Sequence, residues 1–117
     1  NARTESTYRG DVALSYIANK VRQGDEDGMV GLTEMDGITV LQLKQEINGS
    51  EYVTYIYYRD GKLWELFTDT ESGLGVNDGY EILECDEVAM SMDGELLSVS
   101  TSGDGGGRIW LSLRSGG

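Results

Sequence analysis

The chain has 117 residues and a formal net charge of −12, so it is long enough for one ordinary domain and its charge opposes binding to a phosphate backbone. It contains no histidine and one cysteine, which excludes a Ser-His-Asp triad, a Cys-His pair, a histidine-rich metal site and an internal disulfide. Leu, Ile, Val and Phe together supply 27 residues, enough for a folded core despite the charge. We therefore expect a folded protein that binds neither nucleic acid nor a cofactor.

The charge is unevenly placed along the chain. Residues 1–23 hold four basic and two acidic side chains, residues 24–103 hold three basic and eighteen acidic ones, and the remaining fourteen residues carry +1. A mildly basic segment thus precedes an acidic body. We interpret the acidity as solvation of an extracellular or strand-rich surface rather than as a ligand-binding feature.

Residues 1–23 are predicted to form an amphipathic helix. Apolar or small residues recur at helical spacing and make one stripe: Gly10, Ala13, Leu14, Ile17 and Val21. Gly24 is expected to end the helix, with Lys20 and Arg22 in the last turn, where cations complement the exposed carbonyls. No clear N-cap precedes the stripe, so we expect the helix to begin upstream and residues 1–23 to be the distal half of a longer helix.

The face of this helix opposite Ile17 is a candidate contact surface for partner subunits. It is made by Tyr8, Val12, Ser15 and Asn19. Two of these four side chains are sizeable and apolar. The alternative interpretation is that isolated exposed apolar residues are normal on a protein surface.

After Gly24 the hydrophobic period changes from 3.6 to 2, which predicts strands. The predicted strands are 29–34, 38–47, 52–59, 63–67, 80–85, 88–92, 96–100 and 108–113. Asp-Gly and Asn-Gly pairs between alternating runs predict type I′ hairpin turns, at 36–37, 48–49, 60–61 and 93–94. Loops are expected at 68–79 and 101–107.

These elements predict an α+β fold in which an N-terminal amphipathic helix packs on an antiparallel meander of about six to eight strands. The whole chain, 1–117, is expected to be one soluble domain, with the helix at 1–23 and the β head at 24–117. The predicted core residues are Leu14, Ile17, Val21, Leu41, Leu43, Ile56, Leu66, Ile82, Val99 and Leu111. No helical crossover is predicted, so we expect no parallel sheet with a cofactor site at a switch point.

Two acidic stretches are weak candidates for cation binding, and we predict no metal site. Residues 25–28 resemble the opening of a calcium loop. In an EF-hand, however, the glycine is at position 6 of the loop, whereas here it is at the fourth position, and apolar residues follow where oxygen ligands are needed. A solvated turn is the better interpretation there. The loop after residue 67 has four side chains whose oxygen atoms are suited to binding a cation together, although this composition is not specific: Asp69, Glu71, Asn77 and Asp78.

We predict that the chain is not an enzyme. A small acid-base hydrolase stays a remote alternative, because it needs two carboxylates about 5–9.5 Å apart and twenty-one acids make such a pair almost inevitable by chance. Like-charge crowding is greatest at Glu81, Glu84, Asp86 and Glu87. Cys85 is expected to be a small hydrophobic residue in a strand rather than a reactive thiolate.

An aromatic hairpin offers a candidate ligand-stacking surface at Tyr55, Tyr57 and Trp64. Alternation places Tyr55 and Tyr57 on one face of the strand and Tyr52 and Tyr58 on the other. An exposed row of these rings would stack on sugars or peptides. The alternative, which we favour, is that the aromatic residues pack against one another within the sheet.

The chain resembles type IV pilin-like proteins, above all the minor pseudopilins of secretion and competence systems. The resemblance is carried by the helix at 13–23 (ALSYIANKVRQ), the hairpin at 55–64 (YIYYRDGKLW) and the closing strands at 94–99 (GELLSV) and 108–115 (RIWLSLRS). The chain is also similar to an uncharacterised group of secreted proteins from Gram-positive gut anaerobes.

In pilin-like proteins a membrane-embedded apolar half-helix precedes the head, is trimmed by a prepilin peptidase at a Gly-Phe-like junction and packs into a filament core. The 117 residues hold no such segment, no run of eighteen apolar residues and no signal peptide. The resemblance therefore implies a soluble head that reaches the membrane only through an N-terminal anchor missing from this chain. It implies an extracytoplasmic location and helix packing against other pilin-like subunits.

We accordingly expect a non-enzymatic structural subunit of a pilus- or pseudopilus-like assembly that serves secretion, competence or adhesion. The alternative, from the binding class, is a secreted or surface-anchored module that holds a ligand on its aromatic hairpin.

Overall fold

The computed structural model describes residues 2–102 and 107–114, and the side chains of these residues apart from 2–11 and 27. A helix is followed along the chain by strands only. The elements are α1 (Ala2–Asp27), β1 (Met29–Met35), β2 (Ile38–Ile47), β3 (Ser50–Arg59), β4 (Lys62–Asp69), β5 (Tyr80–Glu84), β6 (Val88–Asp93), β7 (Leu96–Thr101) and β8 (Arg108–Ser112). All strand pairs are antiparallel, which confirms an α+β fold with one helix packed on antiparallel β-structure.

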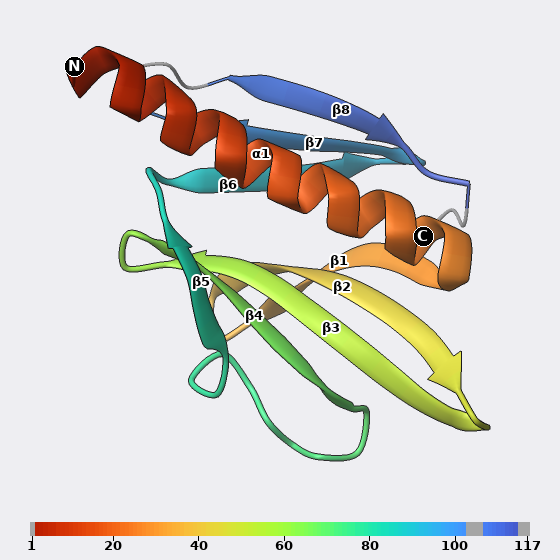
Figure 1. Ribbon diagram of the computed structural model, residues 1–117. Coiled ribbons are helices and arrows are strands. Elements are labelled where there is room, and N and C mark those ends of the chain that lie inside the picture. The colour runs from red at the N-terminus through yellow and green to blue at the C-terminus, as the bar shows by residue number, and fades with distance from the viewer. Residues whose placement is uncertain (1, 103–106, 115–117) are drawn as a thin grey trace.

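The strands form two sheets, where we expected one continuous meander. The five-stranded sheet has the order β1-β2-β3-β4-β5 and the three-stranded sheet the order β6-β7-β8. The break falls between β5 and β6, where the Cys85 amide still bonds to Gly61 of the first sheet and the Glu87 carbonyl already accepts from Ser102 of the second. Because the chain changes sheets here, both sheets can bury a face against the single helix. Figure 1 shows α1 crossing the junction between them.

The helix continues past Gly24, where we expected it to end, so neither Lys20 nor Arg22 lies in the last turn. Gly24 is buried inside α1, and a Cβ atom there would lie 3.1 Å from the Leu43 side chain. Its role is close packing of the helix on β2. Gly28 is the residue that needs to be glycine at the exit, because a Cβ atom would lie 1.9 Å from the Lys44 carbonyl oxygen. The Gly28 amide donates to the Gly24 carbonyl at 2.8 Å and completes the final turn.

Three of the four expected hairpin turns have the conformation that the sequence predicts. Both central residues have positive φ at 36–37, 48–49 and 60–61, as type I′ turns require. The fourth turn is shifted by one residue. Asp93 pairs with Leu96, so the two turn residues are Gly94 and Glu95, and Gly94 alone has a positive φ, of 62°. Glycine at the first turn position is typical of a type II′ turn.

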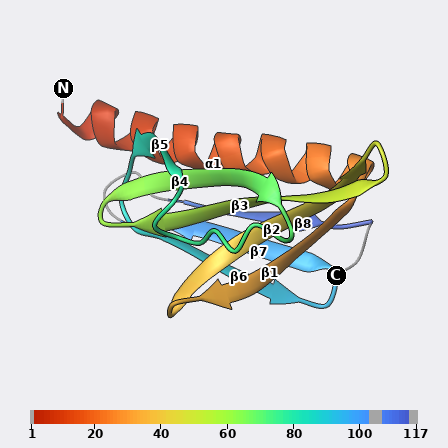
Figure 2. The same ribbon diagram turned by 90° about the horizontal axis from the view of Figure 1, so that it is seen from below.

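The main core lies where α1 meets both sheets. Ala13, Leu14, Ile17 and Val21 of the helix pack there with buried residues of both sheets, which are Val30, Leu41, Leu43, Ile56, Leu63, Val88, Leu97 and Val99, together with Cys85 and Leu113. The predicted core is therefore confirmed except at three residues. Leu66 is buried on the opposite face of the five-stranded sheet, beside Tyr55, because it alternates with Leu63 along β4, and Ile82 and Leu111 are half-buried. Seen from below, the helix lies along one side of the layered strands (Figure 2).

Candidate functional site

The candidate partner surface on α1 is open for much of its described length. Ser15 and Asn19 are exposed and Val12 is half-buried, whereas Ala13 and Ile17, on the other face, are completely buried. Tyr8 lies on the helix, but its side chain is outside those described. In both ribbon views the first turns of α1 extend past the ends of the strands (Figures 1 and 2). One face of the helix thus belongs to the core and the opposite face contacts solvent.

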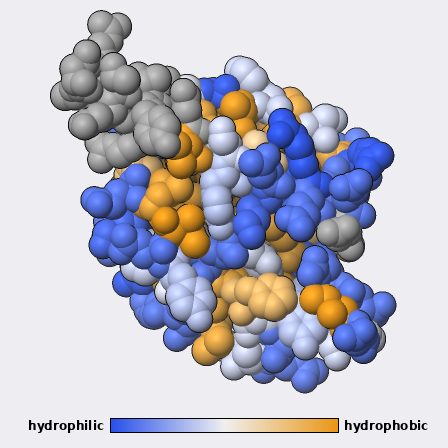
Figure 3. Space-filling view, in the orientation of Figure 1, coloured by the Kyte–Doolittle hydropathy of each residue, from blue (hydrophilic) through white to orange (hydrophobic). Residues whose placement is uncertain are grey.

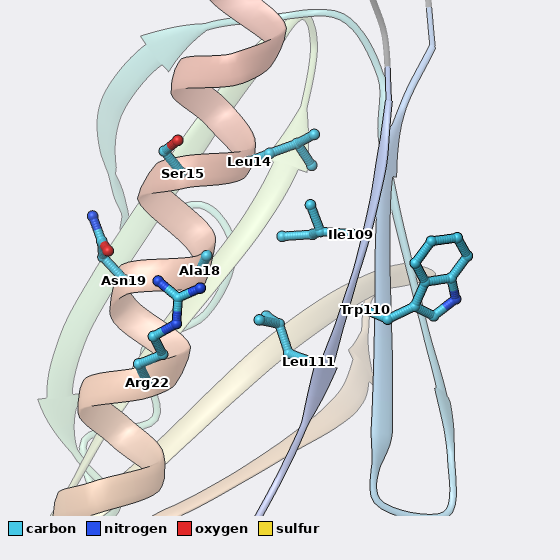
Figure 4. Close-up of a pocket in the computed structure, with 8 residues that line it drawn as sticks. All are labelled: Leu14, Ser15, Ala18, Asn19, Arg22, Ile109, Trp110 and Leu111. Carbon is cyan, nitrogen blue, oxygen red and sulfur yellow. The ribbon is translucent and has the colours of Figure 1, made fainter.

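A groove of about 630 Å³ joins this surface to β8. Leu14, Ile109 and Leu111 form its floor, and their side chains point toward one another between the helix and the strand (Figure 4). Ser15 and Asn19 point away from this floor. Residues of the outer face of α1 therefore lie beside a second element, β8, that the sequence did not connect with them.

Trp110 lies on the far side of β8 and is 59% exposed. Ile109, Leu111 and Leu113 stand at every second position and pack with the main core, whereas Trp110 lies on the other face of the strand. Because the indole points away from α1, Trp110 adds an exposed aromatic side chain to the surface of the three-stranded sheet.

The other flank of α1 is tied to β4 by a polar cluster of Tyr16, Lys20 and Glu65. The Tyr16 hydroxyl donates to Glu65 Oε1, and Lys20 Nζ lies 3.4 Å from the same oxygen. Lys20 Nζ also lies 5.7 Å from the centre of the Tyr16 ring. Burial raises the pKa of Tyr16 well above its usual value, and the hydrogen bond to Glu65 and its negative charge add to this shift. The Tyr16 hydroxyl therefore keeps its proton, and its hydrogen bond to Glu65 links the helix to the sheet.

The candidate stacking surface is mostly internal, so Tyr57 is ruled out as a stacking residue and the favoured interpretation, packing of the aromatic residues within the sheet, is confirmed. Tyr57 is completely buried, and its hydroxyl donates to the Val76 carbonyl at 2.6 Å. Tyr55 and Trp64 are half-buried and pack against the same cluster as Tyr57. Trp64 Nε1 donates to the Arg59 carbonyl at 2.9 Å. The Tyr57 ring offers no face to a ligand, because the loop after β4 covers it.

This loop, residues 70–79, lies over the face of the five-stranded sheet that α1 does not cover. Val76 is its buried anchor, packed with Val40 and Tyr57. The Val76 carbonyl also accepts from Arg59, at 3.2 Å. Gly79 lies so close to Tyr57 that a Cβ atom there would be 2.4 Å from the hydroxyl oxygen. Burial raises the pKa of Tyr57 in this closed environment.

Three of the four polar side chains that we considered for a cation in this loop bond instead to the protein. Asp69 Oδ1 accepts from the Glu71 amide at 2.9 Å, and Asp78 Oδ2 accepts from the Gly75 amide at 2.8 Å. Asn77 Oδ1 accepts from Arg59. In the part of the chain that the structure describes, no three metal-ligating side chains converge. Two of these carboxylates therefore stabilise the turns of the loop.

The acidic residues around β5 lie toward solvent. Glu81, Glu84 and Glu87 are exposed, and Lys62 Nζ lies 3.2 Å from Glu81 Oε1. Cys85 is buried in the main core, as expected for a small hydrophobic residue. Across the described residues, no helix is both long and apolar enough to cross a membrane.

Comparison with known proteins gives one match. A family model described as a domain of unknown function, DUF4860, matches residues 8–104. No curated protein and no solved structure matches the chain. The matched range runs from within α1 through the end of β7 and covers most of the chain. The chain therefore belongs to the DUF4860 family.

Proposed function

We propose that this chain is a non-enzymatic, extracytoplasmic structural subunit of a pilus- or pseudopilus-like assembly. Neighbouring pilin-like subunits pack against the face of α1 made by Tyr8, Val12, Ser15 and Asn19. In the full-length precursor an N-terminal apolar segment continues this helix and anchors the subunit in the membrane. The two sheets form the head that each subunit presents at the surface of the assembly.

The observation that carries the proposal is the contrast between the two faces of α1. Ile17 and Val21 are buried where both sheets meet, so the helix is an integral part of the head. Ser15 and Asn19 on the opposite face are exposed along the same turns. Between Val12 and Glu26, where the side chains are described, the helix is about 22 Å long, so this open face offers an extended contact for a neighbouring helix.

The charge distribution supports contacts between unlike surfaces. Residues 1–23 carry +2, whereas residues 24–103 carry −15. A neighbour that places its acidic head near the basic helix of the next subunit gains electrostatic attraction, whereas two heads that meet repel each other. This pattern favours heterologous packing, which generates rings or filaments, over a symmetric contact between two heads.

The decisive experiment is the N-terminal sequence and intact mass of the native protein purified from its own cell envelope. The proposal predicts roughly twenty apolar residues ahead of the helix, cleaved just before them, with an N-methylated first residue. A conventional signal peptide removed close to Asn1, leaving a free domain, would refute assembly through a membrane-anchored helix.

A second experiment tests the contact face directly. Cysteine is introduced into the full-length protein at Ser15 or at Asn19, and disulfide-linked or cross-linked species are sought in intact cells. The matched control is Ser91→Cys, since Ser91 is an exposed serine on β6. The native Cys85 is buried and adds little background. Cross-linking at Ser91 that equals cross-linking at Ser15 and Asn19 would contradict the assigned face.

A further inference from the structure

A second groove, of about 310 Å³, lies on the opposite flank of α1 from β8. Its polar and aromatic lining comes from Lys20 and Gln23 of the helix, Gln45 of β2, Thr54 of β3, and Glu65 and Phe67 of β4. Four elements thus meet around a space at the small end of the range for ligand pockets, about 300–1,000 Å³. The groove does not overlap the face of α1 assigned to assembly.

The aromatic part of this groove is Phe67, which is 49% exposed. Its ring stacks on that of Tyr52, with centroids 5.5 Å apart and an interplanar angle of 5°. The stacking holds the Phe67 ring in one orientation, so a ligand that contacts the ring does not have to order it first. Figure 3 shows a small apolar area among hydrophilic residues below the helix, on the side of the five-stranded sheet.

Neutral polar groups surround the ring. Thr54 pairs directly with Phe67 across the β3–β4 ladder, and Gln45 pairs with Tyr52 across the β2–β3 ladder. Gln23 is exposed at the helix edge of the groove, and both Gln45 and Thr54 are half-buried. Two amides and a hydroxyl supply both hydrogen-bond donors and hydrogen-bond acceptors. This combination suits a ligand that carries several hydroxyl groups next to an apolar face.

The charged side chains in the groove cancel each other. Lys20 Nζ lies 3.4 Å from Glu65 Oε1, and the side chain of Glu65 is only 20% exposed. The net charge of −12 repels an anionic ligand, and Glu65, the one carboxylate among the lining residues of this groove, is already bonded to Lys20 and Tyr16 rather than free to hold a cation. A neutral ligand meets neither obstacle.

We infer that this groove binds a neutral saccharide, with one pyranose ring stacked on Phe67 and its hydroxyl groups bonded to Gln23, Gln45 and Thr54. The C–H groups on one face of a pyranose ring are apolar and match the flat face of an aromatic ring. The inference does not rest on the assembly role, because none of the four residues assigned to assembly lines this groove.

The test is an NMR titration of the ¹⁵N-labelled protein with three probes: cellohexaose, chitohexaose and maltohexaose. At least one probe is expected to give saturable shifts that include the amides of Gln45, Thr54 and Phe67. Phe67→Ala is expected to weaken that binding about tenfold or more, and Phe67→Tyr to retain it. Trp110→Ala, which removes another exposed aromatic ring, is the matched control and should leave the affinity unchanged.

Absence of saturable shifts with all three probes at about 10 mM would overturn the inference, as would binding that Phe67→Ala leaves intact. If Phe67→Ala does not fold, Gln45→Ala decides in its place and should weaken binding. An extended peptide is the competing ligand, because β5 pairs with β4 only as far as Glu65 and leaves the edge beyond it open. If acetylated tetra-alanine changes the amide chemical shifts along β4 and none of the three saccharides does, saccharide binding is also refuted.

Discussion

The two faces of the five-stranded sheet are covered in different ways. On one face Leu41, Ile56 and Leu63 pack in a core shared with α1 and the three-stranded sheet. On the other face Val40 and Tyr57 are covered by a loop whose buried anchor is Val76. Both faces bury residues completely, but the first is closed by regular elements and the second by an irregular segment. We therefore expect that equally buried residues on the two faces differ in how much their substitution lowers the free energy of unfolding.

Each face also has a tyrosine that joins the sheet to its cover. Tyr16 of the helix donates to the Glu65 carboxylate of β4, whereas Tyr57 of β3 donates to the Val76 carbonyl of the loop. A hydrogen bond to a charged group stabilises more than one between neutral groups. The helix-covered face therefore has the stronger polar link to its cover.

The largest expected effect comes from a matched pair of leucines, one on each face. Leu41→Ala is expected to lower the free energy of unfolding by about 4 kcal/mol and Leu66→Ala by about 2 kcal/mol. Leu41 is completely buried, and Leu66, which pairs with Tyr55 on the loop-covered face, is 3% exposed. The cost is smaller where the loop can collapse into the cavity. Denaturant unfolding measures both, and equal losses would show that the loop is as rigid as the helix.

A smaller effect is expected from Tyr57→Phe, which removes the hydroxyl that bonds to Val76. The expected loss is about 1 kcal/mol, because Arg59 still donates to the same carbonyl. The 70–79 segment should also become easier to cleave in limited proteolysis. Tyr55→Phe on the same face of β3 is the control, since that hydroxyl does not bond to Val76. Unchanged proteolysis in Tyr57→Phe would mean that Val76 packing alone holds the loop.

Alkaline pH should weaken both tyrosine links. The folded state raises the pKa of Tyr16 and of Tyr57, so it holds these protons more tightly than the unfolded chain does. The resulting stabilisation is complete below the unfolded tyrosine pKa of about 10 and is lost as the pH rises above it. The free energy of unfolding, measured from pH 8 to pH 11, should fall less steeply in Tyr16→Phe than in the native chain. Tyr80→Phe, which removes an exposed tyrosine of β5, is the control substitution.

The smallest effect on stability is expected from Phe67→Ala, on the part of the helix-side face that α1 leaves open. Phe67 is half exposed, so its loss should change the free energy of unfolding by about 0.5 kcal/mol or less, the usual range for surface substitutions. Thermal or denaturant unfolding checks this value. A loss above 2 kcal/mol would place Phe67 in the core and would argue against a ligand groove.

Local structure was largely predictable from the sequence. Alternating apolar residues and Asp-Gly or Asn-Gly pairs located every strand to within about two residues at each end. The stripe of Ala13, Ile17 and Val21 correctly predicted the buried face of the helix. These signals act over a few residues, because side-chain alternation and positive φ at a turn depend on immediate neighbours.

Gly24 shows where local signals fail. A glycine after basic residues is typical of a helix end, but Gly24 lies against Leu43 from β2, and the helix continues to Asp27. Close contact between a helix and a distant strand leaves no mark in the residues around the glycine. The true exit, at Gly28, depends on the Lys44 carbonyl of the same strand.

The candidate sites show the same division. Alternation correctly separated Tyr55 and Tyr57 from Tyr52, but it did not indicate which of the two faces would be exposed. The 70–79 loop folded over Tyr57, whereas the end of α1 left Phe67 and Tyr52 accessible.

The sequence by itself determined the helix, the strands, most of the turns and the division into a basic helix and an acidic head. Only the tertiary structure decided that the strands split into two sheets, that α1 lies across both, and that a loop rather than the helix covers Tyr57. The physical reason is that secondary structure follows from short-range patterns, whereas the cover of each sheet face depends on contacts between residues far apart in the chain.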